Sequence, residues 1–157
     1  MEFSQETKQK FQEILSHYPV KTAAVLPAVH LAQEEFGYVS EEIIEYLAKF
    51  MDMSPVFLKN TISFYTMFKG KETGKYLIQV CHTLSCSLMG AGNIIDYIKE
   101  KLNIDVWETT PDKKFTLVKV ECLGSCGTAP VMQINDDYYE NLTEEKIDEI
   151  LNKFTNK

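Results

Sequence analysis

Four cysteines, arranged in two pairs, are the residues of this sequence whose type and spacing could do chemistry. Cys81 and Cys86 lie in "CHTLSCSLMGAG", and Cys122 and Cys126 lie in "ECLGSCGTAPV". Each pair follows a run of apolar, β-prone residues, so we expect both pairs in loops at the ends of strands. Four thiols placed in this way could form disulfides, bind a zinc ion, act as a redox dithiol or hold an iron–sulfur cluster.

The spacing within the pairs narrows these alternatives. Four residues separate the cysteines of the first pair, three separate those of the second, and 35 lie between the pairs. A thioredoxin-type dithiol needs two intervening residues at a helix N-terminus, which neither pair has. Zinc and a [2Fe–2S] cluster both stay open, because each can take four thiolates.

The second loop favours a cluster over zinc. Gly124 and Gly127 let the backbone curl close to a bulky anionic group and direct N–H dipoles toward it. A zinc knuckle usually folds only with its metal, whereas the strands and helices here could supply a core of their own. Hydroxyls that could donate to the sulfurs are present in both loops: Thr83, Ser85, Ser87 and Ser125. We interpret His82 as a loop residue.

Composition and charge limit the classes of function. The 157 residues carry a formal net charge of −7, which argues against nucleic-acid binding. The first ten residues lack the apolar core of a signal peptide, and no stretch approaches the about 18 apolar residues of a membrane span. We therefore expect a cytoplasmic protein without direct membrane insertion. Thiols stay reduced in that compartment, which disfavours a disulfide framework.

The first half of the chain is predicted to be helical. Pro27 should disturb the start of the second helix, which either begins nearer Leu26 or lacks one backbone bond in its first turn. Gly37 is well placed to end this helix. Ser40 is a candidate N-cap, and Ser54-Pro55 repeats this start signal. Four helices are expected, over about 3–18, 22–36, 40–51 and 54–64.

The second half is predicted to alternate strands and helices after a charged, glycine-containing linker at 69–75. The expected strands are 75–81, 115–121, 131–134 and a short one at 138–139, and the expected helices are 88–102 and 143–154. The fold class is therefore α+β, with a helical domain at 1–70 and a thioredoxin-like α/β domain at 75–157. Thr110-Pro111-Asp112 is expected to form a turn, and Pro130 occupies a place where such folds often carry a cis proline.

Several segments resemble one known family over its full length. They are "LPAVHLAQEEFGYVSEE", "FYTMF", "TTPD", "VECLGSCGTAPVMQIND" and "YYENLT". The family is the small [2Fe–2S] subunit of NADH:quinone oxidoreductase, the 24-kDa subunit of complex I. NADH-linked hydrogenases and formate dehydrogenases contain similar subunits. The family commonly has glycine at the positions of Asn60 and Lys113.

The resemblance implies the roles of the cysteines and of a partner. Cys81, Cys86, Cys122 and Cys126 would be the ligands of a [2Fe–2S] cluster. A larger partner subunit would bind FMN and NADH, and the helical N-terminal half, with its apolar "SFYTMF" run, would be the docking module. The "GAG" at 90–92 accordingly lacks the third glycine of a dinucleotide-binding fingerprint.

The sequence as a whole predicts a one-electron transfer subunit beside a partner's flavin, with no catalytic site of its own. The acidic chain should make reduction of the cluster harder, so we expect a low potential, on the order of −400 mV. Two alternatives stay open. One is a non-catalytic adaptor with a structural zinc, and the other is a redox sensor that has the same cluster but no flavoprotein partner.

Overall fold

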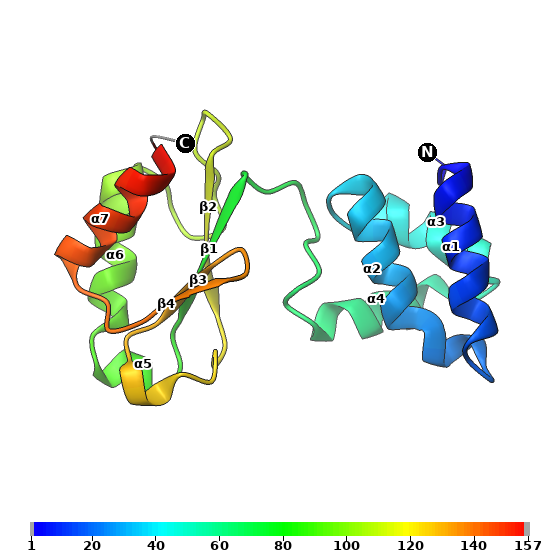
Figure 1. Ribbon diagram of the computed structural model, residues 1–157, viewed down its shortest axis with the longest axis horizontal. Coiled ribbons are helices and arrows are strands. Elements are labelled where there is room, and N and C mark those ends of the chain that lie inside the picture. The colour runs from blue at the N-terminus through cyan, green and yellow to red at the C-terminus, as the bar shows by residue number, and fades with distance from the viewer. Residues whose placement is uncertain (1, 156–157) are drawn as a thin grey trace. The chain divides into compact units, whose positions relative to one another are not determined.

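The computed structural model describes residues 2–155, and the chain divides into two compact units between Glu72 and Thr73 (Figure 1). The first unit is helical and the second contains all the strands found in the described residues. The second unit also contains helices. Within residues 2–155, no helix is both long enough and apolar enough to cross a bilayer.

The first unit consists of α1 (Gln5–Ser16), a 3₁₀ turn (Lys21–Ala24), α2 (Val25–Phe36), α3 (Glu41–Met51) and α4 (Pro55–Phe64). Their apolar faces meet in one core, in which Phe11, Ile43, Leu47 and Leu58 are completely buried. This core gives the unit its stability, because helices of 10–12 residues are marginal in water without packing.

Local signals explain where these helices begin and end. Gly37 adopts a left-handed φ of 82°, and its N–H donates to the Gln33 carbonyl at 2.7 Å. The Ser40 hydroxyl accepts from the Ile43 N–H, so the predicted N-cap is confirmed. Of the two starts considered for α2, the later one, near Leu26, is confirmed, since the helix begins at Val25. A 3₁₀ turn precedes it, and Pro27 lies in the first turn, where a missing N–H costs nothing.

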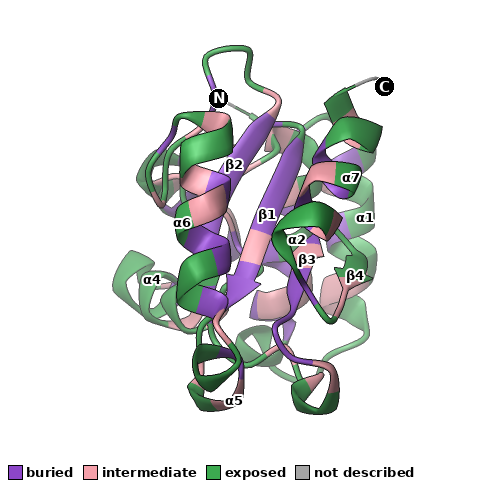
Figure 2. Ribbon diagram, turned by 90° about the vertical axis from the view of Figure 1, so that its left-hand side faces the viewer, coloured by how far each residue is buried: buried purple, intermediate pink, exposed green. Residues whose placement is uncertain are grey.

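The second unit contains a four-stranded sheet in the order β2-β1-β3-β4. The strands are β1 (Tyr76–Cys81), β2 (Phe115–Val120), β3 (Met132–Ile134) and β4 (Asp137–Tyr139). β1 pairs in parallel with β2 and antiparallel with β3, so it lies in the middle of the sheet. Figure 2 shows that β1 and β2 are buried along most of their length, as their apolar residues require.

Helices α6 (Ala91–Leu102) and α7 (Glu144–Thr155) pack against the sheet (Figure 1). Ile98 of α6 and Ile147 of α7 are completely buried in a core that also holds Ile78 and Leu117 of the strands. A shorter helix, α5 (Leu84–Leu88), precedes α6. The helix expected over 88–102 is found as α6, but it begins three residues later, because Gly90, whose φ is 92°, separates it from α5, which was not expected.

Two predicted backbone features of this unit are confirmed. The Thr110 carbonyl accepts from the Lys113 N–H at 2.8 Å, and the Asp112 carboxylate accepts from the Lys114 N–H at 2.9 Å, which closes the expected turn. Lys113 has a φ of 56°, the left-handed conformation that the family's glycine adopts freely. The Ala129-Pro130 peptide bond is cis.

Gly74 provides a test of how closely β1 and β2 approach at their start. Its N–H donates to the Thr116 hydroxyl at 2.7 Å, and a Cβ added to it would lie 2.9 Å from backbone atoms of Lys114 and Phe115. We expect Gly74→Ala to lower the free energy of unfolding of this unit by about 1–3 kcal/mol, because backbone atoms cannot move aside cheaply. The measurement is urea unfolding followed by the fluorescence of Trp107, the only tryptophan.

Gly92→Ala, in α6 of the same unit, is the matched control: a Cβ there meets nothing within 4 Å, its φ is not left-handed, and alanine favours a helix, so this variant should not be destabilised. Equal unfolding midpoints for the two variants would contradict the close approach.

Candidate iron–sulfur site

The first cysteine pair is buried at one end of the sheet. Cys81 is the last residue of β1, and Cys86 lies in α5, with 1% and 2% of their surfaces exposed. The Cys81 N–H donates to the Val131 carbonyl at 3.1 Å, which continues the pairing of β1 with the segment that enters β3. Cys81 thus ends the strand that was expected over 75–81, whereas the loop expected around Cys86 is wrong, since a short helix positions this residue.

The second pair lies in an exposed loop, as predicted. The Sγ atoms of Cys122 and Cys126 are 3.7 Å apart, and both residues are exposed. Gly124 has a left-handed φ of 81°, and its N–H donates to Cys122 Sγ at 3.3 Å. This is the curled backbone that we expected of the loop glycines. Gly127 has no left-handed φ, so Gly124 alone confirms the expectation.

The structure brings the two pairs together. The Leu123 backbone, from the second loop, acts to lower the pKa of the Cys81 thiol, and Cys126 acts to raise that of Cys86, so each pair lies within reach of the other. The side chain of Leu123 also packs against the small buried cluster that contains Cys81 and Cys86. Two distant stretches of the chain thus form one site.

The two buried thiols differ in pKa. Burial raises the pKa of Cys86 to about 11, and its hydrogen bond to Cys81 adds to this rise. Burial also acts to raise the pKa of Cys81, but hydrogen bonds from Thr83 and from the Leu123 N–H outweigh it, so this pKa lies below its usual value. Cys81 is therefore the thiol that this environment prepares as a thiolate, the form that binds metals.

The donor set fits a cluster with two irons. Within the described part of the chain, no three side chains of His, Cys, Asp or Glu are already gathered as a single metal ion would require. Two neighbouring pairs of thiols need not converge on one point, because each iron of a [2Fe–2S] cluster takes two thiolates. Four cysteines in two adjacent pairs are the residues here that could hold such a group.

The hydroxyls near the cysteines only partly follow expectation. Thr83 Oγ1 lies 3.2 Å from Cys81 Sγ, as expected of a donor to sulfur. The Ser125 hydroxyl instead donates to the carboxylate of Glu140, a residue that the sequence analysis did not single out. This bond and one from Thr128 hold the pKa of Glu140 below its usual value. His82 is exposed, with Nε2 3.7 Å from Glu121 Oε1.

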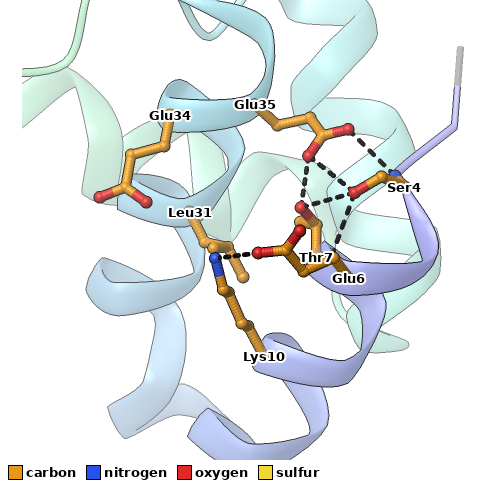
Figure 3. Close-up of a pocket in the computed structure, with 7 residues that line it drawn as sticks. All are labelled: Ser4, Glu6, Thr7, Lys10, Leu31, Glu34 and Glu35. Atoms are coloured by element: carbon orange, nitrogen blue, oxygen red, sulfur yellow. Dashed lines mark hydrogen bonds and ion pairs between the residues drawn. The ribbon is translucent and has the colours of Figure 1, made fainter.

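A pocket in the first unit, between α1 and α2, has no comparable chemistry (Figure 3). The Glu35 carboxylate accepts hydrogen bonds from the Ser4 N–H and from both the Ser4 and Thr7 hydroxyls, and Lys10 pairs with Glu6 at 2.7 Å. Since these groups satisfy one another, we interpret the pocket as a polar contact between two helices. It is lined by Ser4, Glu6, Thr7, Lys10, Leu31, Glu34 and Glu35.

Comparisons with known proteins agree with the geometry of the cysteine site. Residues 11–155 match the model of the thioredoxin-like [2Fe–2S] ferredoxin family. One relative, a subunit of the NADH-quinone oxidoreductase of Rickettsia felis, is 43% identical over 157 residues, which cover 98% of this chain and 94% of the relative. The subunit of the same name from Aquifex aeolicus is 37% identical over 154 residues, which cover 98% and 96%.

A solved structure shares the fold. It is an NAD⁺-reducing [NiFe]-hydrogenase in the air-oxidised state, with a TM-score of 0.69 and 21% identity. The match covers 83% of this chain but only 22% of the hydrogenase chain. This likeness confirms the predicted fold, and the family match confirms the predicted cofactor. The chain belongs to the thioredoxin-like [2Fe–2S] ferredoxins, the family that its cysteine motifs resemble.

Proposed function

We propose that this chain transfers single electrons through a [2Fe–2S] cluster ligated by Cys81, Cys86, Cys122 and Cys126. The observation that carries the proposal is the meeting of the two cysteine pairs, since Leu123, which lies between Cys122 and Cys126, packs against the buried cluster that contains Cys81 and Cys86. When bound, the cluster would supply a one-electron site, which reduction makes more negative. The residues around the cluster would hold it and tune its reduction potential.

Backbone N–H groups around the site would stabilise the negative sulfurs. The Gly124 N–H donates to Cys122 Sγ at 3.3 Å, and the Leu123 and Val131 backbones act to lower the pKa of Cys81 and Cys86. Such donors favour the more negative, reduced state and so raise the reduction potential, whereas the acidic chain lowers it. The balance of these two effects would set the potential.

The chain would work as a small subunit of an NADH dehydrogenase or an NADH-linked hydrogenase, beside a larger subunit that binds FMN and NADH. Two of its relatives are named as subunits of NADH-quinone oxidoreductases, which supports this assembly. We place it in the cytoplasm, with any association with a membrane made through partner subunits. The choice of terminal acceptor would lie in those other subunits.

Exposed apolar side chains support a docking role for the first unit. The "SFYTMF" run at 63–68 is divided, since Phe68 is buried in the helical core while Phe64 and Met67 are 79% and 53% exposed. Val56 and Phe57 of α4 are also exposed. We propose that this docking surface, made of Val56, Phe57, Phe64 and Met67, contacts the flavin-binding subunit, because large apolar side chains exposed together mark protein interfaces.

Cluster binding is tested by anaerobic reconstitution of the full chain with iron and sulfide. We expect a brown protein with about two irons and, after dithionite reduction, a spin-half EPR signal. Cys122→Ser should lose or alter this signal because it removes a ligand. His82→Ala, which changes an exposed neighbour of Cys81, should keep it. A colourless protein with stoichiometric zinc would favour the adaptor alternative.

Docking is tested by isolating the tagged chain from its native cells. We expect a larger flavin-containing chain to accompany the wild type and to be largely lost from the double variant Phe64→Ser, Met67→Ser, because apolar anchors dominate binding at interfaces. Val20→Ser, at another exposed apolar residue of the first unit, is the control. Equal recovery with both variants would contradict the docking surface, and no flavin-containing partner with the wild type would favour the redox sensor.

A further inference from the structure

The segment 138–142, which begins in β4 and runs toward α7, lies against the second cysteine loop, 122–128. The Tyr138 hydroxyl donates to the Leu123 carbonyl at 3.0 Å. The Asn141 N–H donates to the Thr128 carbonyl at 2.7 Å, at the other end of the loop. The segment therefore contacts the loop on both sides of Cys126.

Glu140 makes the side-chain contacts at the centre of this segment. Its Oε1 accepts hydrogen bonds from the Ser125 hydroxyl and from the Thr128 hydroxyl, the latter at 2.7 Å. The two hydroxyl oxygens are themselves 2.9 Å apart, so one carboxylate oxygen gathers both. Ser125 precedes Cys126 directly, and Thr128 follows it by two residues. Glu140 thus holds the backbone on either side of a proposed ligand.

Apart from the bonds made by 138–142, few contacts fix the position of the loop 122–128. No residue of 122–128 is fully buried, and Leu123 is its one apolar side chain that packs against buried clusters, so apolar packing holds the start of the loop but not the part around Cys126. Its own hydrogen bonds are short-range, such as the one from the Thr128 N–H to the Ser125 carbonyl at 3.2 Å. Exposed loops with few buried contacts open at low cost. Beyond Leu123, the position of the loop therefore depends on the bonds that arrive from 138–142.

We propose that Glu140 is a positioning residue for the cluster: its carboxylate fixes the loop that carries Cys122 and Cys126, and its negative charge makes the cluster harder to reduce. The first half of this inference concerns the protein alone, and the second half rests on the proposed function. A positioning partner that also carries charge should affect both retention of the metal and the potential.

The test uses the full chain with Glu140→Ala, Glu140→Gln and a control, Asp136→Asn. Glutamine keeps an oxygen that can accept from both hydroxyls but carries no charge, whereas alanine removes both. Asp136 has the same charge as Glu140 and is exposed in the turn at the opposite end of the β3–β4 hairpin. The control therefore removes one negative charge without touching the loop.

In the cluster-free protein, amide hydrogen exchange measures how often the loop 122–128 opens. We expect the amides of 122–128 to exchange faster in Glu140→Ala, and at close to the wild-type rate in Glu140→Gln and Asp136→Asn. In the cluster-loaded protein, Glu140→Ala should release iron to a chelator faster by about tenfold or more, the usual effect of losing a group that orients a ligand. Glu140→Gln should retain its cluster with a reduction potential more positive than that of Asp136→Asn.

The outcomes separate the two proposals. A wild-type protein that takes up no [2Fe–2S] cluster would overturn the proposed function, while the exchange measurement would still decide whether Glu140 holds the loop. Wild-type exchange and iron release in Glu140→Ala would overturn the positioning role. A Glu140→Gln protein with the potential of Asp136→Asn would overturn the electrostatic role, and this variant also serves if Glu140→Ala does not fold.

Discussion

The hydrogen bond from the Cys81 N–H to the Val131 carbonyl is the contact on which the cysteine site depends. It extends the antiparallel pairing of β1 and β3 to the point where β1 ends. Val131 directly follows Pro130 and so lies just beyond the second cysteine loop. Because strand pairing fixes backbone positions closely, this bond brings the end of one loop to the start of the other. The two pairs of thiols can then meet although 35 residues separate them.

Around that bond, burial of the first cysteine pair opposes ionisation of its thiols, and nearby backbone N–H groups favour it. The first pair lies where burial penalises thiolates, as the raised pKa of Cys86 shows. Backbone N–H groups from Leu123 and Val131 offset part of this cost at Cys81 and Cys86. Leu123 and Val131 lie in or next to the second cysteine loop, so the environment of Cys81 and Cys86 is complete only when that loop packs beside them. The fold thus determines the chemistry of the thiols and not only their positions.

Local signals made much of the fold predictable. Gly37 and Ser40 mark helix ends through bonds to their near neighbours, and the β1 run is apolar because both of its faces are buried. The α5 helix could not be predicted, because it is five residues long and the Thr83 side chain makes no capping bond to its N-terminus. Its existence depends on where the sheet places Cys86.

The candidate site was predictable only as far as its residue types. The four cysteines and Gly124 follow from spacing and from the need for a curled backbone. Glu140 does not, because its role depends on the β3–β4 hairpin folding back beside the loop. For the same reason Ser125, whose place in the loop predicts a donor to sulfur, donates to a carboxylate that follows that hairpin.

The contrast in exposure between the two cysteine pairs has a consequence for assembly and damage. Cys81 and Cys86 are enclosed by the protein, whereas Cys122 and Cys126 face solvent. With the proposed ligation, Cys81 and Cys86 would be the shielded ligands and Cys122 and Cys126 the ligands that solvent reaches. Iron donors and oxidants arriving from solvent would then meet the exposed thiols first.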